Sequence, residues 1–263
     1  ELTRTPGAHF RVLRTEELPV GALDVLFMRK DPPVDVDFLH ATQLVELVRG
    51  RRPVYVNAPS GMRSANEKLW ALQFPQLCPE TLVSRDPEAL KAFVRRQPHG
   101  AVLKPVDGFG GRGVLRAAPG DLNLNALVEV STAAGTAWVV AQRFVPESAG
   151  GDKRILLVGG EPVGAVLRVP SGDDFRCNMA MGGSAEQTGL GARDLEICRA
   201  LGPELVRLGL EFVGIDVIGE HLIEVNVTSP TGLEEAERLG TPGAAARVLA
   251  RVEELARDRA PRA

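Results

Sequence analysis

The chain contains 263 residues, of which 44% are hydrophobic and 25% are charged, and it carries a formal net charge of −3. This length supports one large or two modest domains, and the charge balance does not favour nucleic acid or an acidic membrane as a partner. The longest apolar runs are far shorter than the roughly 20 residues that span a bilayer. Cys78, Cys177 and Cys198 are too widely spaced for a zinc site or a disulfide framework, so we expect a cytoplasmic protein.

The first predicted elements are a strand, a helix and a second strand. Residues 25–28 form a short apolar run, residues 38–48 have helical spacing that Gly50 ends, and residues 54–56 form the next apolar run. This order predicts a β–α–β unit of a parallel sheet.

The middle of the chain mixes short helices with short strands. Helices are predicted at residues 66–74 and 88–95, and strands at residues 81–83, 101–103 and 114–116. A glycine-rich loop separates the last two strands.

The second half is dominated by hairpins. Gly159-Gly160 and Gly219-Glu220 are turn signals between apolar strands, and the long polar stretch 170–191 shows no periodicity. The pattern predicts an α/β (α+β) fold with two or three α+β subdomains facing a cleft, not one doubly wound sheet. The predicted elements are strands at 138–144, 155–158, 161–169, 212–218 and 222–227 and helices at 194–208, 234–239 and 244–256.

Three oxygen-bearing side chains lie on the second hairpin. Glu224 and Asn226 are two residues apart and therefore share a face, and Asp216 lies on the other strand. Burying such a set unpaired is costly, and Mg²⁺ removes that cost because it prefers oxygen ligands. The alternative is the solvated outer face of an edge hairpin, and the spacing alone does not decide between the two.

A second motif is the glycine-rich loop at residues 107–113. Glycine allows backbone N–H groups to approach phosphate oxygens, and Lys104 directly before the loop can deliver a positive charge to them. The loop matches neither the Walker A nor the dinucleotide-binding pattern, because a strand rather than a helix follows it. A simple hairpin is the alternative.

Other polar residues are less specific. A set of cations lies at predicted strand ends and loop borders, although each alone could be solvated: Lys68, Lys104, Lys153, Arg154, Arg168 and Arg176. The four histidines show no hydrolase-like spacing, and the cysteines are better explained as small apolar core residues. No protein nucleophile is predicted.

Five segments in order resemble bacterial glutathione synthetase, an ATP-grasp ligase. The resemblance runs from about Asp24 to the C-terminus, and its ordered spacing is more specific than any single piece. The segments are MRKDPP (28–33), NEKL (66–69), LKP (103–105), GDKR (151–154) and EVNVTSPT (224–231).

The resemblance implies roles for individual residues. Lys68, Lys104 and Lys153 would bind ATP, with the loop glycines Gly108, Gly110, Gly111 and Gly113 folding over its phosphates and the hinge Gln142, Arg143, Phe144 and Val145 reading the adenine. Asp216, Glu224 and Asn226 would hold Mg²⁺, with Mn²⁺ as the alternative metal. Arg154, Arg168, Arg176 and Asn178 would handle carboxylates and the acyl phosphate, and Arg29, Thr228, Ser229 and Thr231 would seat substrates. Residues 170–191 would be the mobile lid of the family.

The implied reaction joins γ-glutamylcysteine and glycine, with ATP and Mg²⁺, through an acyl phosphate. The alternatives are a related ATP-grasp peptide ligase with other substrates and a catalytically impaired ATP-binding remnant. The resemblance implies a partial N-terminal pre-ATP-grasp domain at residues 1–66 and an ATP-grasp domain at 67–263, divided into subdomains 67–145 and 146–263. It also implies a homo-oligomer, dimer or tetramer.

Two departures from the family pattern concern substrates. Residues 1–23 are too few for the additional β–α–β-like segment that the family carries before Asp24, since such a unit needs roughly 30 residues. Ser184 follows Gly182-Gly183 where the family usually has arginine. We therefore expect donor recognition or lid closure to differ.

Overall fold

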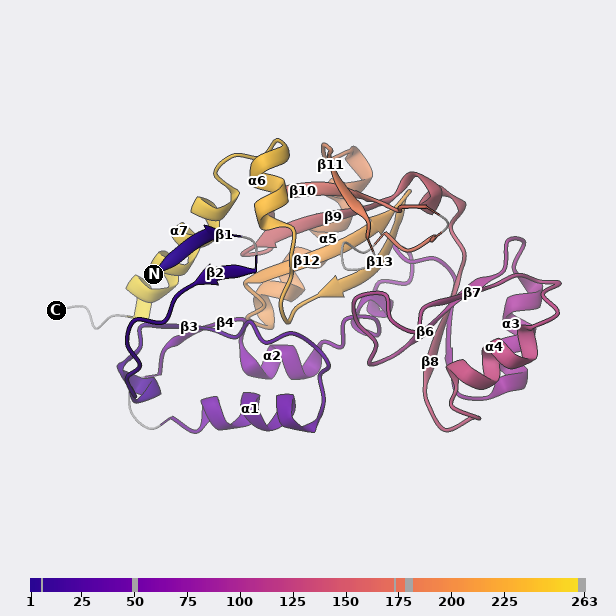
Figure 1. Ribbon diagram of the computed structural model, residues 1–263, viewed down its shortest axis with the longest axis horizontal. Helices are drawn as coiled ribbons and strands as arrows, with labels where there is room; N and C mark the ends of the chain where they lie inside the picture. Colours follow the sequence, from indigo (N-terminus) through magenta and orange to yellow (C-terminus); the bar gives the residue numbers. More distant parts are fainter. Residues whose placement is uncertain (6, 49–51, 173, 178–181, 260–263) are drawn as a thin grey trace.

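The computed structural model describes the chain except residues 6, 49–51, 173, 178–181 and 260–263. Its largest sheet has five antiparallel strands in the order β11-β10-β9-β12-β13. Apolar residues occupy both faces of the central strands, because helices cover both sides (Figure 1). The strands are β9 (Asp152–Val158), β10 (Glu161–Val169), β11 (Ser184–Gln187), β12 (Phe212–Ile218) and β13 (His221–Asn226).

Helices pack on the two faces of this sheet. Helix α5 (Ala192–Arg207) covers the face that carries Ile155 and Ile215. Helices α6 (Leu233–Leu239) and α7 (Ala244–Arg259) cover part of the opposite face. The rest of that face carries polar side chains and borders the cavity described below.

A second sheet has four antiparallel strands in the order β5-β8-β6-β7. Helices α3 (Pro87–Arg96) and α4 (Leu124–Ser131) bury one of its faces, with Phe93 and Leu103 in the shared core. The strands are β5 (Thr81–Ser84), β6 (Ala101–Pro105), β7 (Leu115–Ala117) and β8 (Val139–Arg143).

The N-terminal part contains the predicted β–α–β unit. Strands β3 (Val25–Phe27) and β4 (Val54–Val56) pair in parallel, and α1 (Val36–Glu46) connects them. The described residues also include three 3-10 turns, Val20–Ala22, Trp70–Gln73 and Pro146–Gly150.

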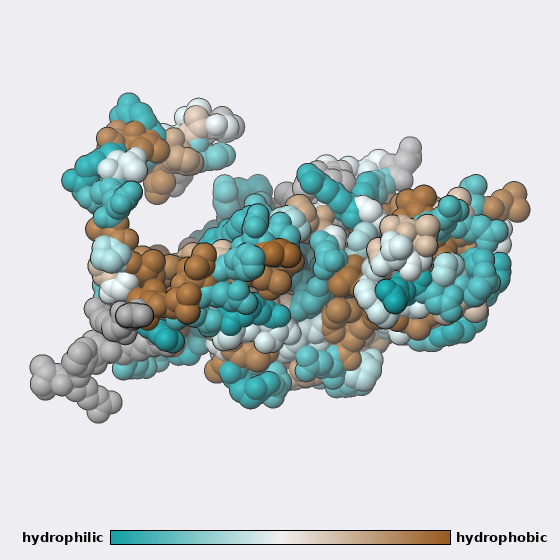
Figure 2. Space-filling view, turned by 90° about the horizontal axis from the view of Figure 1, so that it is seen from below, coloured by the Kyte–Doolittle hydropathy of each residue, from teal (hydrophilic) through white to brown (hydrophobic). Residues whose placement is uncertain are grey.

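Two elements of the N-terminal part lie outside that unit. Helix α2 (Pro59–Ser64) follows β4. A hairpin of β1 (Leu2–Thr5) and β2 (Ala8–Phe10) projects from the body, and every residue of β2 is exposed (Figure 2).

Most predicted elements are confirmed within a few residues, but several expectations are wrong. The helix expected at 66–74 is reduced to a 3-10 turn, Trp70–Gln73. The stretch 170–191 contains β11, which sequence periodicity did not indicate because its residues are small or polar and mostly exposed. Helices α2 and α4 and the hairpin β1-β2 were not predicted. Gly50, the expected helix stop, lies outside the described residues.

No helix among the described residues is long and apolar enough to cross a membrane.

Candidate active site

A cavity of about 430 Å³ lies between the two larger sheets. Strands β6 and β8 of the four-stranded sheet contribute one wall, and β9, β10, β12 and β13 of the five-stranded sheet contribute the other. Most of the residues that the sequence singled out line this cavity. They are Lys68, Lys104, Gly108, Gly110, Gly111, Gln142, Arg143, Phe144, Val145, Arg154, Arg168, Arg176, Asp216, Glu224, Asn226, Thr228, Ser229 and Thr231.

The hairpin β12-β13 brings the predicted metal-binding side chains together. Asp216 pairs with Glu224 across the hairpin, and Gly214 pairs with Asn226. Asp216 is only 4% exposed, which excludes the solvated outer face as an explanation. Ile215, Val217, Val225 and Val227 are buried on the opposite face, as their alternation predicted.

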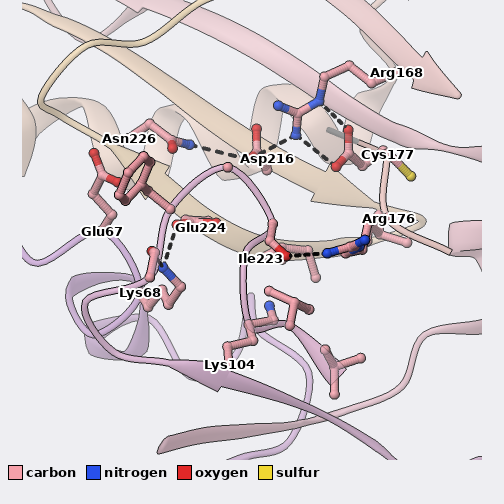
Figure 3. A pocket seen from close by; sticks show the side chains of 18 of the residues that line it. Glu67, Lys68, Lys104, Arg168, Arg176, Cys177, Asp216, Ile223, Glu224 and Asn226 are labelled. Atoms are coloured by element: carbon pink, nitrogen blue, oxygen red, sulfur yellow. Dashed lines mark hydrogen bonds and ion pairs between the residues drawn. The ribbon is translucent and has the colours of Figure 1, made fainter. Parts of the chain in front are cut away.

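Asp216 is held by two arginines. Arg154 donates to both of its carboxylate oxygens at 2.5 and 3.0 Å, and Arg168 Nη2 lies 3.0 Å from Oδ2. Although burial disfavours the charged carboxylate, these guanidinium groups keep the pKa of Asp216 well below its ordinary value. Figure 3 shows Asp216 between Arg168 and Asn226.

The oxygen donors fit a divalent cation that shares its coordination with a phosphate. Glu224 lines the cavity, and its Oε1 forms an ion pair with Lys68 Nζ at 3.2 Å. The amide of Asn226 donates through Nδ2 to Gly214 and Asp216, which leaves its oxygen for a ligand. Within the described part of the chain, no cluster of three acidic, histidine or cysteine residues could hold a metal by itself. Mg²⁺ commonly completes such sites with substrate phosphate oxygens.

Arg168 also binds a carboxylate that the sequence analysis missed. It donates to both oxygens of Asp152 at 2.5 and 2.7 Å. Burial raises the pKa of Asp152, and the two nearby arginines oppose that rise. The signal was present, since Asp152 and Arg154 are two residues apart on a strand and therefore share a face.

Lys104 faces strand β8. Its buried Nζ donates to Gln142 Oε1 at 2.8 Å, and Gln142 in turn donates to Thr81. Burial lowers the pKa of Lys104, while Glu224 opposes this shift. A buried lysine with one neutral partner is suited to an anionic ligand.

The glycine-rich loop is held from two sides. Lys68 Nζ donates to the carbonyl of Gly108, and Arg176 Nη1 donates to the carbonyl of Gly111 at 2.8 Å. Gly110 and Gly111 have φ values of 60° and 77°, a region that favours glycine. The loop therefore borders the cavity between a lysine and an arginine that both line it.

Glu67 is a second carboxylate that sequence reasoning missed. Its Oε1 accepts from the hydroxyl of Thr228 at 2.8 Å and from the backbone N–H groups of Val227 and Thr228. The neighbouring Ser229 hydroxyl donates to Asp31. Glu67 stands beside Lys68 in the NEKL segment, so the motif contained the signal.

Three predicted residues do not line the cavity. Lys153 was expected to bind ATP, but it points to the α5 face of the sheet, where its Nζ lies 2.5 Å from Asp194; alternation along β9 separates it from Arg154. Arg29 lies outside the cavity and donates to the carbonyl of Pro230 at 2.9 Å. Gly113 belongs to the loop but packs against Pro105. Asn178 lies outside the described residues.

Comparison with known families agrees with this geometry. Residues 67–241 match the model of the ATP-grasp domain of prokaryotic glutathione synthetase, and residues 1–63 match the model of its N-terminal domain. The chain belongs to the prokaryotic glutathione synthetase family.

Curated members of the family are close relatives. A glutathione synthetase of Xanthomonas campestris pv. campestris is 53% identical over 223 residues, which span 84% of this chain and 70% of the relative. A glutathione synthetase of Thermosynechococcus vestitus is 47% identical over 234 residues, which span 89% of this chain and 73% of the relative.

Solved structures show the same fold at low sequence identity. The D-cycloserine synthetase DcsG superposes with a TM-score of 0.63 at 18% identity, covering 85% of this chain and 78% of that chain. The ATP-grasp ligase PsnB with a minimal precursor gives 0.62 at 18% identity, covering 95% and 88%. The predicted ATP-grasp fold is confirmed, and this member of the glutathione synthetase family is an ATP-dependent ligase that forms a carbon–nitrogen bond.

Proposed function

We propose that the chain joins γ-glutamylcysteine to glycine, with ATP and Mg²⁺, and so makes glutathione. The observation that carries this proposal is that one cavity gathers nearly all the family-motif residues, in a chain about half identical to curated glutathione synthetases. Mn²⁺ is the expected substitute for Mg²⁺.

The chemistry begins with activation of a carboxylate, which is a poor acyl donor. Transfer of the γ-phosphoryl group to the carboxylate of γ-glutamylcysteine gives an acyl phosphate, and the glycine amine then displaces phosphate. Bound Mg²⁺ supplies charge stabilisation for the phosphoryl oxygens. Glu224 and Asn226, with Asp216 behind them, are the residues that would hold it.

The cationic side chains around the cavity position the reacting groups. Lys68 and Lys104 are placed to bind phosphate oxygens, and Arg154 and Arg168 form the opposite wall next to Asp216. These fixed charges complement the negative charge that accumulates during phosphoryl transfer. The reaction needs no protein nucleophile, in agreement with the sequence, where none was predicted.

Water would hydrolyse an acyl phosphate, so the site must be closed during turnover. Arg176, from the segment expected to be the lid, bonds Gly111 of the glycine-rich loop at 2.8 Å. This contact joins the two segments over the nucleotide side of the cavity. We propose that it helps to exclude water.

The direct test is turnover with defined substrates. The purified chain is incubated with ATP, Mg²⁺, γ-glutamylcysteine and glycine, and ADP and glutathione are quantified by chromatography. We expect equal amounts of both products. Absence of ADP release above background contradicts the proposal, and ADP release without glutathione points to a related ligase with other substrates.

A variant tests the metal assignment. Glu224→Gln removes a carboxylate ligand and should reduce Mg²⁺-dependent turnover by about 100-fold or more, while circular dichroism stays unchanged. Glu129→Gln, on the exposed face of α4, is the matched control and should keep full activity. Activity that survives Glu224→Gln would show that the metal assignment is wrong.

We further propose a homo-oligomer in the cytoplasm whose partners are small molecules, which light scattering and fractionation would check. We also propose a domain boundary near residue 66 and a subdomain boundary near residue 145. The strand positions support the second boundary, since the last strand of the four-stranded sheet ends at Arg143 and the first strand of the five-stranded sheet begins at Asp152.

A further inference from the structure

Glu67 is a cavity-lining carboxylate that the reaction as described above does not use. It is partly buried, and only one of its two oxygens has hydrogen-bond partners among the described residues. Oε1 accepts three hydrogen bonds from Val227 and Thr228, whereas Oε2 accepts none from any residue that the structure describes. The side chain is thus fixed by one oxygen, and the other is available to a ligand.

The carboxylate also lacks a cation of its own. Lys68, its neighbour in sequence, forms its ion pair with Glu224 at 3.2 Å, and no ion pair joins Glu67 to a cation in the described part of the chain. Burial first, and then the nearby charge of Glu224, raise the pKa of Glu67, against the opposing hydrogen bond from Thr228. Lys68 compensates this negative charge only in part, because its ion pair is with Glu224, and a ligand that carries a positive charge would stabilise the carboxylate further.

Glu67 lies at the reacting end of the cavity. The Lys68–Glu224 pair links it to the phosphate-binding residues, and Figure 3 shows Glu67 next to Lys68 and Asn226. The loop that begins at Thr228 continues to Ser229 and Thr231, which also line the cavity. A group held by Glu67 would therefore sit beside the activated carboxylate and not at the adenine hinge.

The substrates offer two ammonium groups to this carboxylate. The ammonium of γ-glutamylcysteine is about 8 Å from its reacting carboxylate in an extended conformation. The ammonium of the incoming amino acid belongs to the nitrogen that attacks. The position of Glu67 next to Glu224 favours the ammonium group of the incoming amino acid.

We infer that Glu67 binds the ammonium group of the acceptor amino acid through Oε2, takes one proton from it, and so positions the resulting neutral amine for attack on the acyl carbon, from which phosphate leaves. This inference rests on the proposed function, because it assumes that an amino acid is the acceptor. Thr228 and the two backbone N–H groups keep the carboxylate oriented while Oε2 contacts the substrate.

Glu67→Gln is the decisive variant, since the glutamine oxygen can keep the three hydrogen bonds made by Oε1. The amide NH₂ then faces the cavity and repels an ammonium group. We expect the KM for glycine to rise about 10- to 100-fold, the range for loss of a charge-assisted hydrogen bond. The KM values for ATP, γ-glutamylcysteine and Mg²⁺ should stay within about threefold.

Hydroxylamine separates ammonium recognition from a structural role, because it is an uncharged acceptor at neutral pH. It attacks the acyl carbon, the bond to phosphate breaks, and a hydroxamate forms. Wild type and Glu67→Gln should make hydroxamate at similar rates although they differ with glycine. Glu211→Gln is the matched control, because Glu211 is also a buried glutamate but pairs with Arg251 away from the cavity. This substitution should leave the KM for glycine unchanged.

The outcomes distinguish the two proposals. If wild type makes glutathione and Glu67→Gln keeps the KM for glycine, the role of Glu67 is refuted and the proposed function stands. A larger effect on Mg²⁺ or on γ-glutamylcysteine than on glycine also refutes it, in favour of a metal ligand or a donor contact. If wild type makes hydroxamate but no glutathione, glycine is not the acceptor and both proposals fail.

A second variant, Glu67→Asp, tests the same role if Glu67→Gln fails to fold. It keeps the negative charge but withdraws it by one methylene, and we expect a smaller rise in the KM for glycine than with glutamine. An unchanged KM for glycine in this variant would likewise refute the assignment.

Discussion

Two lysines of similar sequence context occupy opposite environments. Lys104 is buried in the cavity wall with Gln142 as its hydrogen-bond partner, whereas Lys153 reaches the other face of β9 and pairs with Asp194. The sequence suggested nucleotide contacts for both. Successive residues of a strand point to opposite faces, so Arg154 and Lys153 could not both face the cavity.

This difference predicts contrasting effects of the same substitution. Lys104→Met should raise the dissociation constant for ATP about 10- to 100-fold, because it removes a charged donor to phosphate. Lys153→Met should leave that constant within about threefold but lower the free energy of unfolding by about 1–3 kcal/mol, since the buried Asp194 loses its cation. Calorimetric titration and urea denaturation measure the two quantities, and equal loss of ATP affinity in both variants would contradict the assignment.

At the scale of elements, strong local signals were predicted well. The glycine turn at Gly159-Gly160 adopts positive φ values of 57° and 81° and joins β9 to β10 as expected. Helix α4 was missed because its β-branched residues weaken a helical pattern, and β11 was missed because exposed polar residues dominate it. In both cases tertiary packing outweighs local preference.

Asn57 links two sheets and was not singled out by the sequence. It follows β4, is 3% exposed, and exchanges 2.7 Å hydrogen bonds with the N–H and carbonyl of Phe212 on β12 and with the carbonyl of Val227. One side chain thus satisfies three buried backbone groups.

Asn57→Ala leaves these backbone groups without partners and should lower the free energy of unfolding by about 2–4 kcal/mol. Urea denaturation followed by circular dichroism measures the loss. Asn125→Ala, on the exposed face of α4, should change it by no more than about 0.5 kcal/mol. Similar values for the two variants would contradict the bridging role of Asn57.

Burial in the folded molecule as a whole sets the pKa values of the three cysteine thiols. All are free and buried, and burial raises the pKa of Cys78 to about 11 and those of Cys177 and Cys198 to about 12. The folded chain therefore keeps thiol protons that the unfolded chain releases above about pH 8.5. The stabilisation is complete below that pH and is lost as the pH rises towards the folded pKa values.

We expect the free energy of unfolding to fall by about 1–2 kcal/mol per buried thiol between pH 8 and pH 10. Urea denaturation at pH 8, 9 and 10 gives the slope. Cys198→Ala removes one titrating thiol and should make the slope shallower, whatever its effect on stability at pH 8. Parallel slopes for wild type and variant would rule out this origin of the pH dependence.

Local alternation, turn glycines and ordered motifs are encoded in short segments, so the strands and hairpins, the ATP-grasp family and most of the residues that line the cavity could be predicted from the sequence. Which charges meet could be seen only in the folded molecule. It pairs Asp216 with two arginines, turns Lys153 away, and adds Asp152 and Glu67 to the site. The physical reason is that ion pairs and burial depend on distances between segments far apart in the chain, such as the 161 positions between Glu67 and Thr228.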